Sequence, residues 1–286
     1  MKKPLKVTIV ITVSIITALS VVLLGFHFFR QKGQAREEII VQPANNTVLE
    51  PDESVLIAQC SPTESLFYLA GNLKNFQSYY ATITGEVSAG GIYKQKVAGE
   101  KYIVGEKSLY ITTATSSLKK LAMQIYMEND AVLLRNGNVD TGVYENETES
   151  YTYLDYLQEY GTDYRNLSNY VLNENTILRA TLVSAQDGLY TYEYEINLET
   201  GVNPYRVNMY KMGNLNSLPT MHKCVLTVVM TENFMPVSIR HYDEYSVDMF
   251  ITLNCKSTLI ETFPKINDDS ITIPELEFFQ ENMPTI

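Results

Sequence analysis

One stretch of the chain differs from the rest because it contains no charged residue over 23 positions, 7–29. As an α-helix it would extend about 35 Å, against a hydrocarbon core of about 30 Å. A cleaved signal peptide has a shorter apolar region and ends at a small-x-small site, whereas Phe28 and Phe29 close this run. A lipoprotein signal would need a cysteine directly after the run, and the first is Cys60. We therefore predict an uncleaved transmembrane helix over 7–29.

The charges beside this run leave its orientation open. Three lysines precede it and three basic residues follow it by position 36, so the positive-inside count is nearly balanced. A short basic start followed by an apolar run is the layout of an export signal, and long domains translocate largely regardless of charge. We expect residues 1–6 to form a cytoplasmic stub, and the body to lie outside the cell membrane behind an extracytoplasmic linker over 30–60.

The pattern after the linker is that of one folded domain, 61–286. Ser61 and Glu64 form a capping box, and apolar residues then recur at helical spacing up to Asn75, which predicts a helix. From Tyr79 the period changes to two, which predicts strands. Turn residues separate them. The strands are expected from 79 to the Gly90-Gly91 turn and at 92–104, 107–115, 119–128, 131–136, 176–186, 189–199, 223–231, 237–245 and 249–263.

Three further helices and one loop complete the pattern. A helix is expected from Tyr151 to Tyr160, because Gly161 can end it. A short helix is expected near 166–172, and another from Asn203 to Lys211, where a proline follows the cap. Three alternating glutamates, at 145, 147 and 149, are interpreted as an acidic solvated loop. The run Val225–Met230 is apolar on both faces, which predicts a central strand covered on both sides.

The charge is unevenly distributed. Residues 1–36 contain six basic groups and no acid, which leaves 16 basic and 33 acidic groups in the body, a net charge of −17. Phosphate neutralisation needs a basic face, so the body is not expected to bind nucleic acid. For the same reason it is not expected to lie on an anionic lipid surface through its net charge.

No catalytic or metal-binding motif stands out. If the chain turns at Asn233-Phe234, His222 would face Tyr245 and lie four residues from His241, too far for a shared metal ion. Cys224 would face Asp243, and three free, mostly buried thiols are expected, with a Cys224–Cys255 bridge as the minor alternative. Nucleophile-elbow, Walker and dinucleotide motifs are absent from the sequence. We expect neither a cofactor nor an enzyme.

The 21 tyrosines, all within the body, are the unusual feature of the composition. Strands favour tyrosine, so its first interpretation is a half-buried sheet face with hydroxyls at the rim. The alternative is an amphipathic lining for a ligand or a partner surface. Two sets of alternating side chains are the candidates for ligand contact. They are Tyr190, Tyr192 and Tyr194 on one strand and Met123, Ile125 and Met127 on another.

The order of elements resembles the half-barrel of bacterial lipoprotein carriers and related lipoprotein lipid-binders. The stretch 79–135 carries this likeness, with its run Ala81-Thr82-Ile83-Thr84-Gly85 and the paired strands that follow. In those families a curved sheet wraps an apolar cavity closed by helices. The chain also looks like an uncharacterised group of membrane-anchored Firmicutes exoproteins, in segments such as 169–173 and 187–192. Carriers must leave the membrane, whereas this chain is predicted to be tied to it, so shuttling is not expected.

These observations lead to one expectation. The fold class is α+β: an N-terminal transmembrane helix followed by a large curved antiparallel, half-barrel-like sheet with a few covering helices. We expect a binding protein of the cell membrane that holds an apolar or lipid-like ligand between sheet and helices. The alternative is an envelope sensor or partner-binding regulator without a small ligand. A hydrolase based on Asp and Glu is the third class.

Overall fold

The computed structural model describes residues 45–52, 54–116, 120–138, 141, 143–213, 215–248, 251–274 and 279. The stub, the proposed membrane helix 7–29 and the first half of the linker therefore lie outside the described residues. Within the part of the chain that is described, no helix has both the length and the apolar character needed to cross a bilayer.

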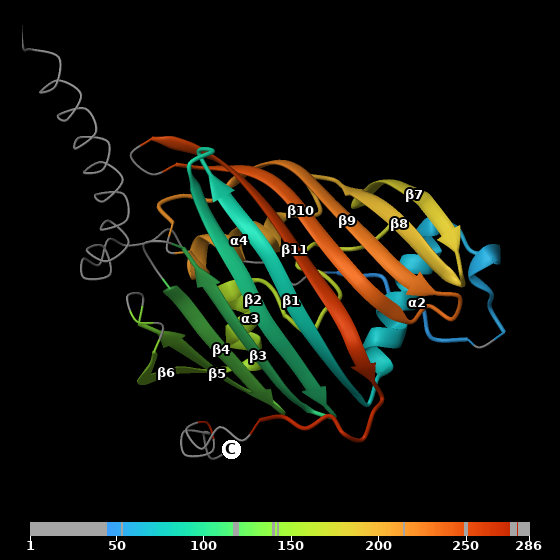
Figure 1. The fold of residues 1–286 in the computed structure, drawn as a ribbon, viewed down its shortest axis with the longest axis horizontal. Coiled ribbons are helices and arrows are strands. Elements are labelled where there is room, and N and C mark those ends of the chain that lie inside the picture. The colour runs from blue at the N-terminus through green and yellow to red at the C-terminus, as the bar shows by residue number, and fades with distance from the viewer. Residues whose placement is uncertain are drawn as a thin grey trace, which may run out of the picture.

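The body is built on one open sheet of 11 antiparallel strands, in the order β6-β5-β4-β3-β2-β1-β11-β10-β9-β8-β7 (Figure 1). Strands β1–β6 pair with their neighbours in the chain, as do strands β7–β11, and β1 pairs with β11 to join these two halves of the sheet. The strands are β1 (Ser78–Ala89), β2 (Tyr93–Val104), β3 (Lys107–Thr115), β4 (Lys120–Glu128), β5 (Ala131–Gly137), β6 (Tyr144–Thr152), β7 (Ile177–Gln186), β8 (Leu189–Ile196), β9 (Thr220–Thr231), β10 (Pro236–Asp248) and β11 (Thr252–Ile266). The expected α+β class and the large antiparallel sheet are confirmed.

Three α-helices lie on one face of this sheet, which curves around them (Figure 1). They are α2 (Pro62–Asn75), α3 (Tyr153–Tyr160) and α4 (Asn203–Met212), and a 3-10 turn, η2 (Ile57–Gln59), precedes α2. The capping box at the start of α2 is confirmed: Ser61 N donates to Glu64 Oε2 at 2.8 Å and Glu64 N donates to Ser61 Oγ at 3.2 Å. We call the helix-bearing side the concave face and the other side the convex face.

Alternation along the strands assigns side chains to these two faces as expected. Tyr79, Ala81 and Ile83 point into the concave face and are buried. The Gly90-Gly91 turn after β1 is also confirmed, with φ of 58° and 71°, values that glycine adopts without steric cost. On the convex face, Phe279 stacks on Tyr126 with ring centroids 5.5 Å apart and covers part of the sheet.

Two predicted elements are wrong. The glutamates at 145, 147 and 149 lie in an edge strand, β6, and not in a loop. Residues 166–172 form no helix but part of an irregular segment. The helix expected from Tyr151 begins two residues later, because Thr152 is its cap and accepts a hydrogen bond from Asp155 N at 3.1 Å.

The predicted β9–β10 register is confirmed in part. Cys224 pairs with Asp243, but a bulge between Glu244 and Tyr245 shifts the pairing so that Tyr245 faces Met221 and not His222. Cys60, Cys224 and Cys255 are free, which rules out the Cys224–Cys255 bridge. The run Val225–Met230 lies in β9, which β8 and β10 flank, although its convex-face members Thr227 and Val229 are only partly buried.

Candidate functional site

The concave face carries two apolar clusters, one toward the β7 edge of the sheet and one toward the β6 edge. The larger cluster joins α2 to β1 and β8–β11 and includes Leu66, Leu69 and Leu226. The smaller cluster joins α3 to β4 and β5 and includes Tyr156, Val132 and Leu134. We call them the α2 cluster and the α3 cluster.

Each set of candidate ligand residues belongs to one of these clusters. Tyr192 and Tyr194 are buried in the α2 cluster, where Tyr194 Oη donates to Pro62 O at 2.7 Å, and Tyr190 packs against it. Ile125 and Met127 are buried in the α3 cluster, and Met123 packs against it. Within each set the side chains share one face, as the alternation predicted, and for both sets this is the concave face. However, seven strand spacings separate β4 from β8, roughly 34 Å along the sheet. The structure therefore does not bring the two sets together.

An irregular segment crosses the concave face between the two clusters. We call this segment, Gly161–Thr176, the strap. Its Leu167 and Tyr170 are buried in the α2 cluster, whereas Tyr164 packs against both clusters. The strap thus covers the part of the concave face that lies between the two apolar clusters.

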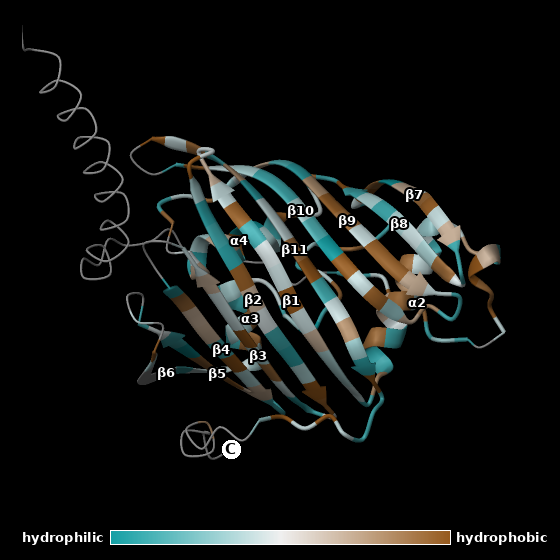
Figure 2. Cartoon of the chain, viewed as in Figure 1, coloured by the Kyte–Doolittle hydropathy of each residue, from teal (hydrophilic) through white to brown (hydrophobic). Residues whose placement is uncertain are grey.

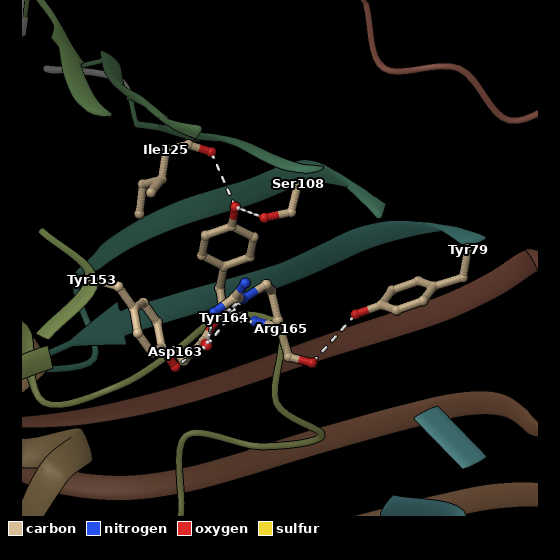
Figure 3. A network of polar contacts seen from close by, with 7 residues as sticks. All are labelled: Tyr79, Ser108, Ile125, Tyr153, Asp163, Tyr164 and Arg165. Carbon is tan, nitrogen blue, oxygen red and sulfur yellow. Dashed lines mark hydrogen bonds and ion pairs between the residues drawn. The ribbon is translucent and has the colours of Figure 1, made fainter. Parts of the chain in front are cut away.

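The first half of the strap is held by the network drawn in Figure 3. Arg165 forms an ion pair with Asp163 at 2.8 Å, and Tyr153 Oη of α3 donates to the same carboxylate at 2.7 Å. Burial acts against the charge of Arg165, but its bonds to Asp163 raise the pKa of the guanidinium above its ordinary value. The guanidinium also lies over the Tyr153 ring, 4.8 Å from its centroid. This clamp fixes the strap to α3.

Hydroxyl groups attach this half of the strap to the sheet. Tyr164 Oη lies 2.7 Å from Ser108 Oγ on β3 and donates to Ile125 O on β4 at 3.3 Å (Figure 3). From β1, Tyr79 Oη donates to Arg165 O at 3.4 Å. Burial raises the pKa of Tyr79 and Tyr164 well above the ordinary value, so both phenols stay protonated and can donate.

The second half of the strap contacts two polar groups of β10, the partly buried His241 and the fully buried Asp243. Ser168 Oγ lies 3.0 Å from His241 Nε2, and Tyr170 Oη donates to Asp243. Asp243 has no exposed surface and also accepts hydrogen bonds from Ser257 at 2.9 Å and from Tyr205 of α4 at 3.1 Å. These contacts link the strap, α4 and two strands through one carboxylate.

The environment of these two groups shifts both of their pKa values. Burial raises the pKa of Asp243, against the hydrogen bonds from Tyr170 and Ser257, which lower it. Burial, aided by the charge of Lys101, lowers the pKa of His241 to about 4. His241 is therefore neutral at pH 7.

A buried ion pair continues this polar band across β2 and β11. Lys101 Nζ lies 2.7 Å from Glu261 Oε1, and their side chains are only 4% and 10% exposed. The contact meets the distance of an ion pair but not the angles of a hydrogen bond at Glu261 Oε1. The two charges still attract each other at this distance, because an ion pair acts at any angle whereas a hydrogen bond needs alignment.

The carboxylates of Asp243 and Glu261 are farther apart than the catalytic pair of a glycosidase. Ser257 pairs with Asp243 and lies four residues before Glu261 on β11, which separates the carboxylates of Asp243 and Glu261 by about 13 Å along the strand direction. A glycosidase pair is about 5–10 Å apart. Among the described residues, no group of three or more His, Cys, Asp or Glu side chains is arranged to hold a metal ion.

Neither a protein-family model nor a curated protein sequence matches the chain. Among solved structures, it is similar to a LolA superfamily protein from Nitrosomonas europaea, at 14% identity and a TM-score of 0.29, over 76% of this chain and 100% of that one. It is also similar to MucB in complex with MucA(peri), at 6% identity and a TM-score of 0.14, over 71% of this chain and 94% of that one. At TM-scores this low, neither likeness carries functional information.

Proposed function

We propose that the chain is a membrane-anchored, extracytoplasmic binding protein that holds an apolar or lipid-like ligand between the concave face and its helices. The observation that supports this function most directly is the strap. It crosses the concave face without helix or strand, and it separates two apolar clusters that its Tyr164 touches at once. Displacing the strap would uncover both clusters on one face, with the polar groups that now contact the strap between them.

The attachments of the strap are of a kind that a ligand could replace. Among the backbone hydrogen bonds of the described residues, none joins residues 162–170 to a strand. Side chains attach the strap to the sheet, in five contacts that involve Tyr79, Ser108, Ile125 O, His241 and Asp243. Side-chain contacts of this kind can be broken without unpairing the sheet.

A rough comparison of free energies sets the size of the ligand. Five hydrogen bonds contribute about 5 kcal/mol in net terms, and uncovering Leu167 and Tyr170 adds about 4 kcal/mol. Burying one methylene group gains about 0.8 kcal/mol, so about 11 methylenes would balance the cost. We therefore propose a ligand with a long alkyl chain, for which Tyr190, Tyr192, Tyr194, Met123, Ile125 and Met127 are the proposed contacts.

The test is a chain-length series of fluorescent fatty acids, titrated into the detergent-solubilised full-length protein, together with mass spectrometry of lipids that co-purify with it. We expect binding to strengthen with chain length and to become measurable near 12 carbons. Tyr170→Phe removes a contact of the strap and should tighten binding about fivefold, since one net hydrogen bond no longer opposes displacement.

Tyr205→Phe is the matched control. It removes the same kind of hydroxyl from the same carboxylate, Asp243, but Tyr205 belongs to α4 and not to the strap. Equal effects of the two substitutions would show that the carboxylate matters and the strap does not. Absence of both co-purified lipid and fatty-acid binding would overturn the proposed function.

A second candidate function, partner binding, is favoured by the edge strand β7. Leu178, Leu182 and Val183 are 60%, 46% and 60% exposed there, and Arg179 is the only charged residue of the strand. The opposite edge strand, β6, has three glutamates in nine residues. Charge is a common guard against strand addition, so β6 is protected and β7 is open to an extended segment of a partner.

Site-specific photo-crosslinking tests this second candidate. A crosslinker at Leu182 on β7 should yield a defined adduct in cells, whereas one at Glu149 on β6 should not. The same adducts from both positions, or none from Leu182, would remove the case for partner binding at this edge.

A further inference from the structure

A row of lysines crosses the strands on the convex face, near the end of the sheet that carries the β1–β2 and β10–β11 turns. Neighbouring strands place Lys94 opposite Ser88, Ser88 opposite Lys256, Lys256 opposite Glu244, and Glu244 opposite Lys223. Two residues further along the strands, Lys96 and Lys120 flank Thr115 of β3. We call Lys94, Lys96, Lys120, Lys223 and Lys256 the lysine stripe, and all five are exposed.

Acidic groups only partly offset the charge of the stripe. Glu86 pairs with Lys94 at 3.2 Å, and Glu244 pairs with Lys256 at 3.1 Å. Asp248, at the end of β10, adds one more carboxylate. The end of the sheet that carries the stripe is therefore positive, although the body as a whole has twice as many acidic as basic groups.

Two apolar side chains project from the same end of the molecule. Ile92, in the β1–β2 turn, is 77% exposed, and Ile251, between β10 and β11, is 63% exposed. The two hairpins lie side by side, since Gly90 N donates to Asn254 O at 2.8 Å. Figure 2 shows apolar colouring at the turn that joins β10 to β11. Isolated exposed side chains are ordinary, but here two of them extend beyond a row of lysines.

The other end of the same strands has the opposite charge. Its turns and strand ends carry two lysines and six acidic residues. These are Lys107 and Lys265 with Glu106, Glu128, Asp130, Glu232, Asp268 and Asp269. Because the two ends differ in sign, an anionic surface attracts one end and repels the other, which orients the whole body.

We propose that the lysine-stripe end of the sheet docks on an anionic phospholipid surface, with Ile92 and Ile251 entering the headgroup region. Charge complementarity and the two exposed isoleucines support a bilayer, because the surface of an acidic protein would satisfy the lysines but not the isoleucines. The proposed anchor at 7–29 would keep the body within reach: residues 30–44 span at most about 50 Å when extended. This inference refines the expectation from net charge, since a local stripe and not the total decides the contact.

The absence of tryptophan from the sequence makes this proposal directly measurable. In full-length Ile92→Trp the only indole lies at the hairpin turn. The protein is reconstituted into vesicles that contain brominated phosphatidylcholine, with or without 30% phosphatidylglycerol. We expect the tryptophan emission to be at least halved by bromine quenching when phosphatidylglycerol is present, and to recover in 0.5 M salt.

Val183→Trp is the position control, because Val183 is also well exposed, at 60%, but belongs to β7, near the opposite end of the strands. Its emission should stay unquenched in both vesicles. Ile251→Trp repeats the measurement at the second turn. Replacing Lys96, Lys120 and Lys223 by Gln leaves the two ion pairs in place and should return the quenching of Ile92→Trp to its level without phosphatidylglycerol.

The outcomes separate clearly. Quenching that is the same for Ile92→Trp and Val183→Trp, or that does not depend on phosphatidylglycerol, overturns the proposal. Neither result depends on whether the concave face binds a ligand, so the proposed function and this docking surface can fail independently.

Discussion

His241 and Asp243 show how single residues of the concave face join several elements. They lie two apart on β10 and point to the same side, where Ser168 and Tyr170 of the strap meet them. A neutral imidazole and a fully buried carboxylate both lose solvation, and each regains polar contact from the strap. The stability of this region should therefore depend on pH.

Folding stability should fall as the pH is lowered from about 6.5 to about 4. The unfolded chain binds a proton on His241 near pH 6.5, whereas burial lowers the pKa of the folded state to about 4, so acid favours unfolding in this window. The contribution is about 2–3 kcal/mol, since His241 keeps some exposure. Urea unfolding at several pH values measures it. His241→Gln should reduce the change of unfolding free energy with pH, whereas His222→Gln, at an exposed position, is the control and should not. Equal pH dependence of the wild type and His241→Gln would contradict the prediction.

The buried pair Lys101–Glu261 should be costly to break and inexpensive to replace. Lys101→Met leaves a buried carboxylate without its cation and should lower the free energy of unfolding by about 3–5 kcal/mol. Adding Glu261→Met should recover most of this loss, since an apolar pair of similar size needs no solvation. Chemical denaturation measures both variants. Lys94→Met, which breaks the exposed pair with Glu86, is the control and should change little; a similar loss there would contradict this account.

At the scale of elements, the parts fixed by local signals are the ones that the sequence predicts well. The capping box of α2 and the glycine turn after β1 involve residues close together in the chain, and both are as expected. The acidic strand β6 is missed because an edge strand needs only one partner and tolerates charge on both faces. Pairing with β5 decides its conformation, and no feature of its own sequence shows that partner.

The strap is the part of the candidate site that sequence patterns miss. Residues 166–172 have apolar spacing that suggests a helix, but Ser168 Oγ accepts a hydrogen bond from Tyr170 N and so competes with helical bonding. The same i to i+2 bond occurs at Asp163 and Asn173, at intervals of five residues. That spacing of turn-forming side chains is a signal that could have identified the strap. Its contacts with His241 and Asp243 bridge 73 positions, which no local pattern reveals.

Loosening the strap should make it sensitive to trypsin. Arg165 is clamped by Asp163, so Asp163→Ala removes its partner and also the turn that holds Arg165 N. We expect cleavage after Arg165 to be at least tenfold faster, with a smaller change in the midpoint of global unfolding, because local opening does not require the sheet to unpair. Limited proteolysis followed by mass spectrometry measures the site. Cleavage at the exposed Arg179 is the internal control, and an equal increase there would indicate general unfolding.

At the scale of the whole molecule, the arrangement follows from one long sheet that stays open. Its concave face is filled by three helices and the strap, and its two ends differ in charge. Neither feature can be predicted from the composition of the body, which has 16 basic and 33 acidic groups. The strand register decides which of these groups lie next to one another. The two proposals thus use different surfaces, the concave face for a ligand and the lysine-stripe end for the membrane.

Both proposals require the body to be outside the cell and tethered, which cysteine labelling can test. Val183→Cys places an exposed thiol on the body, and Lys3→Cys places one in the stub before the apolar run. A membrane-impermeant maleimide should label Val183→Cys in intact cells and Lys3→Cys only after permeabilisation, because the proposed membrane helix over 7–29 would separate the two positions. Background from Cys60, which is only partly buried, is measured in the parent protein. Labelling at the stub alone in intact cells would reverse the orientation, and loss of Lys3→Cys from the membrane-bound protein would show that the apolar run is cleaved.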